Sequence, residues 1–206
     1  MDLEEEKQLV AEAKYDQEAF GRLFDFYYPK IINYLIKRTG DIELARDICS
    51  ETFFRALNKL WQFQWRTIPF SAWLYKIAIN ELNGYYRRQG RHRIFSFEAL
   101  RETTGFESVD PQDLLAELKE AEEELARHNL FLTVRTELSK LPLKYQEVIS
   151  LKYFENKKIS EISQILGKKE GTVKSLLSRG LKKLKLGTQP FAEKSIIITA
   201  GLKENI

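Results

Sequence analysis

The sequence predicts an all-α protein made of two small helical domains. Apolar residues recur at spacings of three and four along most of the chain, which is the period of an amphipathic helix. Strand-like patterning is scarce: only Ser195–Thr199 is β-like, and one isolated strand cannot build a sheet. The 206 residues suit one large or two small domains, because a domain typically has about 100–150 residues. We place the two domains at residues 1–95 and 129–187.

Two amphipathic helices are expected early in the first domain. The second of them begins at Ile42 and continues its apolar stripe to Leu60. Gly40 can end the preceding helix, and Asp41 is a favourable N-cap for the next one. The apolar stripe of that preceding helix contains Phe20, Phe24, Tyr27, Ile31 and Leu35.

Residues 65–95 combine positive charge with aromatic side chains. They include six basic residues and one acidic residue, a net charge of +5. Basic side chains follow a strand's phosphates while aromatic rings stack on unpaired bases, at about 1–3 kcal/mol per base. Trp65 and Phe70, close to Pro69, are therefore candidates for a pocket that holds an unstacked base, whereas Trp73 is expected in the core. Asn80 can read a base edge, although a capping or core role fits it nearly as well.

An acidic segment, residues 96–128, separates the two domains. It has three basic and ten acidic side chains, and Thr103-Thr104-Gly105 and Asp110-Pro111 are both unfavourable to a helix. Its net charge of −7 would be repelled by DNA, so we expect it to lie away from a duplex or against another protein.

The second domain is basic and carries a helix-turn-helix pattern. Residues 129–187 include 13 basic and 5 acidic side chains, a net charge of +8. A short helix over 159–166 is expected to end at Gly167, and a second helix is expected to begin near Thr172. Val173, Leu177, Leu181 and Leu184 would form its buried side and Lys174, Ser178, Lys182 and Lys185 its outer side. An ordinary helical hairpin with solvated lysines is the alternative that these helices alone leave open.

In a helix-turn-helix domain the second helix lies in the major groove, with its N-terminal residues toward the base edges. The candidate DNA contacts are Lys168, Lys169, Glu170, Gly171, Thr172, Lys174, Ser175, Ser178 and Arg179.

This segment resembles region four of the sigma-70 family of RNA polymerase sigma factors. The resemblance rests on residues 138–142, 148–153, 161–163 and 171–175. It implies binding of the minus-thirty-five promoter element and of the flap of the polymerase β subunit. Leu176 stands where the family usually has arginine, which removes a DNA contact normally available there. Ser163 replaces the usual alanine.

The first domain resembles region two of the same family. The resemblance rests on residues 16–28, 40–41 and 45–53, and it implies docking on the coiled-coil clamp helices of the β′ subunit. Asp47 and Glu51 lie four residues apart on one helix face, as an acidic patch for a basic partner would require, although plain solvation is the simpler explanation of that spacing. Ser50 replaces the family's usual glutamine. The residues assigned to polymerase binding are Asp41, Asp47, Ile48, Glu51 and Phe53.

The string Trp-Leu-Tyr-Lys-Ile-Ala-Ile-Asn at 73–80 is similar to the extracytoplasmic-function group of this family. In that group this helix and the loop before it read and open the minus-ten element. Gly84 replaces an aspartate common in the family, and we expect a bend or an early helix end there. The residues assigned to minus-ten DNA are Trp65, Arg66, Phe70, Asn80, Tyr85, Arg87, Arg88 and Arg91.

The sequence gives no support for an enzyme, a metal or a cofactor. His92 and His128 lie in different segments, and no Gly-rich phosphate loop or metal-ligand spacing is present. Cys49 is the single cysteine, so an internal disulfide is excluded. No apolar run reaches the ~20 residues of a membrane span, and Met1–Lys7 is unlike a secretory signal. We therefore expect a cytoplasmic protein without membrane insertion.

Three functions differ in how they use the two basic segments. A stand-alone activator would leave residues 65–95 unused, and a single-stranded RNA binder would leave the helix-turn-helix unused. A sigma factor uses both, with core RNA polymerase and promoter DNA as partners; an anti-sigma factor is a further partner common in the group. The role of the tail, residues 188–206, is open between packing on the second domain, binding a partner and being loose.

Overall fold

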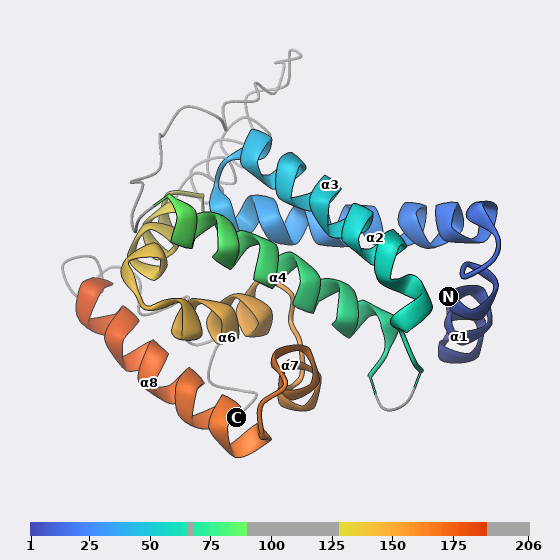
Figure 1. Ribbon diagram of the computed structural model, residues 1–206. Helices are drawn as coiled ribbons and strands as arrows, with labels where there is room; N and C mark the ends of the chain where they lie inside the picture. The colour runs from blue at the N-terminus through green and yellow to red at the C-terminus, as the bar shows by residue number, and fades with distance from the viewer. Residues whose placement is uncertain (66–67, 90–127, 189–206) are drawn as a thin grey trace, which may run out of the picture.

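The computed structural model describes residues 1–65, 68–89 and 128–188, and the regular structure in these ranges is helical (Figure 1). This confirms the all-α prediction. The β-like segment at 195–199 and nearly all of the predicted linker and tail lie outside the described residues, so the domain boundaries remain predictions. Within the ranges given above, no helix combines the length and apolar character that a membrane span requires.

The first domain consists of helices packed around one apolar core. The helices are α1 (Leu3–Glu12), α2 (Gln17–Thr39), α3 (Ile42–Lys59), a 3-10 turn (Leu60–Gln62) and α4 (Phe70–Arg88). Gly40 ends α2 in the left-handed conformation, with φ of 68°, and the Asp41 side chain accepts the Leu44 N–H at 3.0 Å at the start of α3. Both predicted helix ends are confirmed.

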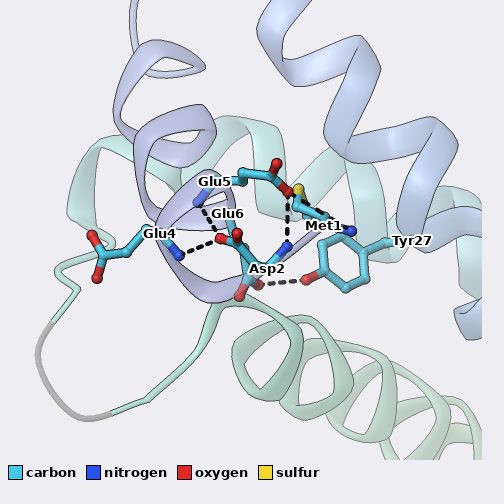
Figure 2. Close-up of polar contacts among 6 residues, drawn as sticks. All are labelled: Met1, Asp2, Glu4, Glu5, Glu6 and Tyr27. Carbon is cyan, nitrogen blue, oxygen red and sulfur yellow. Dashed lines mark hydrogen bonds and ion pairs between the residues drawn. The ribbon is translucent and has the colours of Figure 1, made fainter.

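Helix α1 was not predicted. The carboxylate of Asp2 accepts the N–H groups of Glu4 and Glu5, and the Glu5 carboxylate accepts the Asp2 N–H in return (Figure 2). This capping box satisfies the first turn, and Leu9 and Val10 are buried against the rest of the domain. A helix of ten residues is marginal by itself, so these tertiary contacts stabilise it.

Helix α4 continues through Gly84, and the predicted bend or early end is wrong. An interior glycine costs about 1 kcal/mol relative to alanine, which packing can outweigh. The residues around Gly84 supply that packing: Leu82 is buried, and the Asn83 side chain donates to Glu147 at 2.8 Å.

The second domain contains a helical segment described over 128–140, followed by three further helices. These are α6 (Leu143–Tyr153), α7 (Ile159–Leu166) and α8 (Glu170–Thr188). Gly167 ends α7 with φ of 63°, as predicted. Helix α8 begins at Glu170, two residues before the predicted Thr172, because the Lys169 carbonyl already accepts the Val173 N–H at 3.1 Å.

The two domains pack against each other. Tyr75 of α4 donates its hydroxyl to Glu155 at 2.6 Å, and the Lys37 ammonium lies 3.6 Å from the same carboxylate. Burial and this bond raise the pKa of Tyr75, so its hydroxyl remains a donor. In Figure 1, α4 crosses the molecule between the helices of the first domain and those of the second.

Candidate nucleic-acid and polymerase interfaces

The predicted minus-thirty-five residues gather on the turn before α8 and on the first turns of that helix. Of these nine, Lys168 and Ser175 are half-buried, and the others are exposed. Arg179 donates to both the hydroxyl and the backbone carbonyl of Ser175, which holds the guanidinium along the helix surface. Lys182, Lys183 and Lys185 extend the exposed basic side of α8. The arrangement suits a helix that meets phosphates along its length and base edges at its start.

Leu176 belongs to the core and not to the exposed face of α8. Its side chain is only 7% exposed, and together with Val173 and Gly180 it forms the innermost side of the helix. The predicted buried stripe omitted Leu176 and included Leu177, Leu181 and Leu184, which are half-buried. A leucine here therefore fills the interior.

The exposed side of α4 presents a row of residues spaced by four. Lys76, Asn80 and Arg88 are exposed, and Gly84 lies between the last two. A Cβ atom at Gly84 would lie 3.5 Å from the Arg88 guanidinium, an ordinary contact distance, so the Arg88 side chain reaches back along the helix toward this point of the row. Arg87 is exposed beside Arg88. This row could follow a nucleic-acid backbone along the helix.

Phe70 is a core residue, which corrects its assignment to a base pocket. It is the first residue of α4 and is fully buried. The centroid of its ring lies 5.6 Å from each of the rings of Tyr27, Phe63 and Trp73, so no face is left for a base. The rings that bury Phe70 include Tyr27, which lies far away in the sequence, so no local pattern shows this burial.

Of the other predicted minus-ten residues, two keep accessible aromatic rings. Trp65 is half-buried, with its ring 6.0 Å from that of Phe63, and Tyr85 is half-buried, with its ring 5.9 Å from that of Tyr86. Arg66 and Arg91 lie outside the described residues. Trp65 is therefore the aromatic candidate in the described part of the loop before α4.

The predicted polymerase-binding residues divide between surface and core. Asp41 and Asp47 are exposed, and Glu51 is half-buried. Ile48 and Phe53 are only 6% and 4% exposed, so they support the helix from inside and their assignment to a partner surface is corrected. Both lie on the side of α3 that packs on the domain core, where apolar residues at helical spacing belong.

An apolar stripe missed by the sequence analysis adjoins these acidic residues. Phe54, Leu57 and Trp61 are 62%, 45% and 70% exposed and follow one another at spacings of three and four. Three large exposed apolar side chains in one row are typical of a protein-binding surface. The helical spacing predicts Leu57 on the buried side of this helix, and that prediction is wrong. Phe54 and Trp61 lie outside the predicted apolar stripe.

Glu51 is engaged by a neighbouring guanidinium. Arg55 donates to Glu51 at 2.5 Å and lies 3.1 Å from Glu81 of α4. The bond to Glu51 is the main cause that raises the pKa of Arg55. The Glu51 and Arg55 side chains are 43% and 44% exposed, and surface pairs of this kind contribute little to stability, so Glu51 can exchange Arg55 for a partner's cation.

Among the described residues, His, Cys, Asp and Glu side chains form no group that could hold a metal ion. Cys49 is fully buried, and burial raises the pKa of its thiol to about 12. The thiol is therefore protonated and unreactive at neutral pH.

Comparison with known proteins finds two family regions in the chain. Residues 23–92 match Sigma-70 region 2, and residues 131–184 match Sigma-70, region 4. RNA polymerase sigma factor YlaC of Bacillus subtilis is 33% identical over 172 residues, which cover 82% of this chain and 91% of that protein. The ECF RNA polymerase sigma factor BldN of Streptomyces coelicolor is 31% identical over 170 residues, 82% of this chain but 60% of that longer relative.

A solved structure shares the fold. It is the sigma factor RpoE in complex with the anti-sigma factor NepR from Bartonella quintana, with a TM-score of 0.56, 20% identity, and coverage of 82% of this chain and 96% of that one. The chain thus belongs to the sigma-70 family, in the group of extracytoplasmic-function RNA polymerase sigma factors.

Proposed function

We propose that this sigma factor binds core RNA polymerase, directs it to specific promoters and promotes strand opening there. In this proposal α3 contacts the β′ clamp helices through Asp47, Glu51 and the apolar stripe of Phe54, Leu57 and Trp61. Helix α4 and the loop before it engage the minus-ten element. Helix α8 engages the minus-thirty-five element, and the second domain meets the β flap. The polymerase supplies the catalysis.

One observation carries this proposal: two separate exposed basic surfaces fall within the two family regions. The surface on α8 is exposed along a helix that follows a short turn, which suits the major groove. The surface on α4 shares its helix with Tyr85 and follows the loop that carries Trp65, which suits an unpaired strand. An activator with a single DNA-binding domain would leave the basic surface on α4 without a role.

Run-off transcription tests the proposal. The purified chain is mixed with core polymerase on a promoter library, and the start sites are mapped. We expect a subset of promoters to be transcribed only when the chain is present, while the chain alone binds promoter duplex poorly. If the chain neither joins core polymerase nor changes where transcription starts, the proposal is wrong.

An anti-sigma factor is the partner proposed to control this activity. The fold is shared with a sigma factor solved in complex with an anti-sigma factor. Core RNA polymerase and the anti-sigma factor would then compete for the exposed stripe of Phe54, Leu57 and Trp61. Competition between core polymerase and a candidate anti-sigma factor for the chain, measured by fluorescence anisotropy, tests this partner directly.

A further inference from the structure

The N-terminal segment reaches both ends of the loop that precedes α4. At one end the Lys14 ammonium donates to the Phe63 carbonyl at 2.8 Å. At the other end the Glu6 carboxylate accepts the Ser71 N–H at 3.2 Å. These contacts join positions 49 and 65 residues apart in the chain, so nothing local in the sequence indicates them.

Glu6 satisfies a helix start that has no cap of its own. The N-cap of α4 is Pro69, which makes no side-chain hydrogen bond. The first N–H groups of a helix need an acceptor, and the positive end of the helix dipole favours a carboxylate there. Glu6 supplies this acceptor from α1, a separate helix.

Tyr27 fixes the position of the Glu6 carboxylate. Its hydroxyl donates to Glu6 at 2.5 Å, and burial followed by this bond raises the pKa of Tyr27, which keeps the proton on the phenol (Figure 2). The Tyr27 ring also lies 5.6 Å from that of Phe70, the first residue of α4. One carboxylate thus links α1, α2 and the start of α4.

The burial of Glu6 argues for positioning as its main role. Glu6 is 6% exposed. Burying a carboxylate costs its hydration free energy, and the hydrogen bonds to Glu6 do little more than compensate for that cost. Such a group contributes little net stability, but its directional bonds fix the geometry of what it touches. What it touches here is the start of α4, immediately after the loop that carries Trp65.

We propose that Glu6 and Lys14 form a brace that positions Trp65 and the start of α4 for promoter opening. This inference rests on the proposed function, because that position matters only if α4 and Trp65 engage the minus-ten element. Glu6 and Lys14 are positioning residues: they hold Ser71 and Phe63, and Trp65 lies between those two anchors.

The test compares duplex and pre-melted promoters with polymerase holoenzyme. Glu6→Ala removes the acceptor, Lys14→Met removes the donor while keeping the stem, and Glu6→Gln keeps an acceptor oxygen. We expect Glu6→Ala and Lys14→Met to reduce opening of duplex promoter, followed by permanganate reactivity of thymines, by about tenfold, the scale of one hydrogen bond to a charged group. Opening should be largely restored in Glu6→Gln, and transcription from a pre-melted bubble should be nearly unchanged in all three.

Glu12→Ala is the matched control, since Glu12 is an exposed glutamate of the same helix that is bonded by Gln8. It should behave as the unaltered chain. Core-polymerase affinity and the unfolding transition are measured in parallel. Normal duplex opening by Glu6→Ala and Lys14→Met would overturn the brace, and so would equal defects on both templates or a parallel loss of polymerase binding. Failure of the unaltered chain to open any promoter would instead refute the proposed function on which the brace depends.

Discussion

Phe70 and Phe54 carry the same side chain in opposite surroundings. Phe70 is fully buried among aromatic rings at the start of α4, whereas Phe54 is 62% exposed on α3. Aromatic rings bury large apolar areas, so the first should contribute to folding, and the second is available for a partner. The identity of a residue therefore does not determine whether it serves the core or the surface.

We predict opposite results for the same truncation at these two positions. Phe70→Ala should lower the free energy of unfolding by about 3–5 kcal/mol, because it leaves a cavity in the core. Phe54→Ala should leave stability within about 0.5 kcal/mol, since it changes an exposed site, but should weaken binding to core polymerase. Urea denaturation and a polymerase-binding titration measure the two effects. Equal stability losses would contradict the assignment of Phe54 to a partner surface.

At the scale of the elements, α8 has one side that approaches α6 closely and another that is basic. A Cβ atom at Gly180 would lie 3.0 Å from Ile149 Cδ1 and 3.2 Å from Tyr145 Cβ, both on α6. The absence of a side chain at Gly180 thus allows the two helices to approach. On the opposite side Lys174, Ser178 and Lys182 are exposed.

Alanine at Gly180 should destabilise the fold although it favours the helix. The gain in helix propensity is up to about 1 kcal/mol, but overpacking against a neighbouring helix typically costs about 1–3 kcal/mol. Gly21 is the matched control, because it lies within α2 and a Cβ atom there would meet nothing within 4 Å. We expect Gly180→Ala to lower and Gly21→Ala to raise the denaturation midpoint. A higher denaturation midpoint in both variants would show that α6 and α8 can move apart at little cost in free energy.

The exposed side of α8 should give a salt-dependent contribution to DNA binding. Lys174→Ala is expected to weaken binding of the holoenzyme to the minus-thirty-five element whatever its sequence. It should also reduce the slope of log affinity against log salt by about one, the value for one lost phosphate contact. Lys140→Ala, a change at an exposed lysine paired with Glu137, is the control and should leave the slope alone. If the slope is also unchanged in Lys174→Ala, Lys174 does not contact a phosphate.

At the scale of the whole molecule, the two domains are held together. Tyr75 donates to Glu155, Asn83 donates to Glu147, and the Arg135 guanidinium lies where a Cβ atom at Gly40 would be. If the two domains engage separate promoter elements, as proposed, these contacts limit how far apart the domains can lie in the free chain.

We predict that Tyr75→Phe shifts the free chain toward separated domains. The change removes the hydroxyl that donates to Glu155 across the interface. A hydrogen bond to a charged group contributes about 1.5–3 kcal/mol, or roughly 10- to 150-fold in the equilibrium. Dyes on Ser50→Cys and Lys183→Cys would report the separation as a fall in energy transfer, and the buried Cys49 should remain unlabelled.

Tyr15→Phe makes the same change at a residue that is 94% exposed and serves as the control. Its energy transfer should match that of the unaltered chain. An equally high transfer in Tyr75→Phe would show that the Glu155 contact does not hold the domains together.

Local chemistry accounts for what the sequence predicted correctly. The helical period, the left-handed glycines at 40 and 167 and the Asp41 cap are set by residues within a few positions of each other. The basic surface of α8 was equally readable, because charged side chains on an amphipathic helix face away from its apolar side. The family motifs are also made of residues that are close together in the sequence.

Tertiary structure decided the features that depend on residues far apart in the chain. It buried Phe70 and Leu176, exposed the stripe containing Phe54, and kept α4 helical through Gly84. It also placed Glu6 at the start of α4 and Glu155 beside Tyr75. The sequence by itself determined most of the helices and their charge, but not α1, which depends on tertiary contacts. Which face of each helix is buried depends on its neighbours, and the free energy of that packing is set by contacts that no local pattern records.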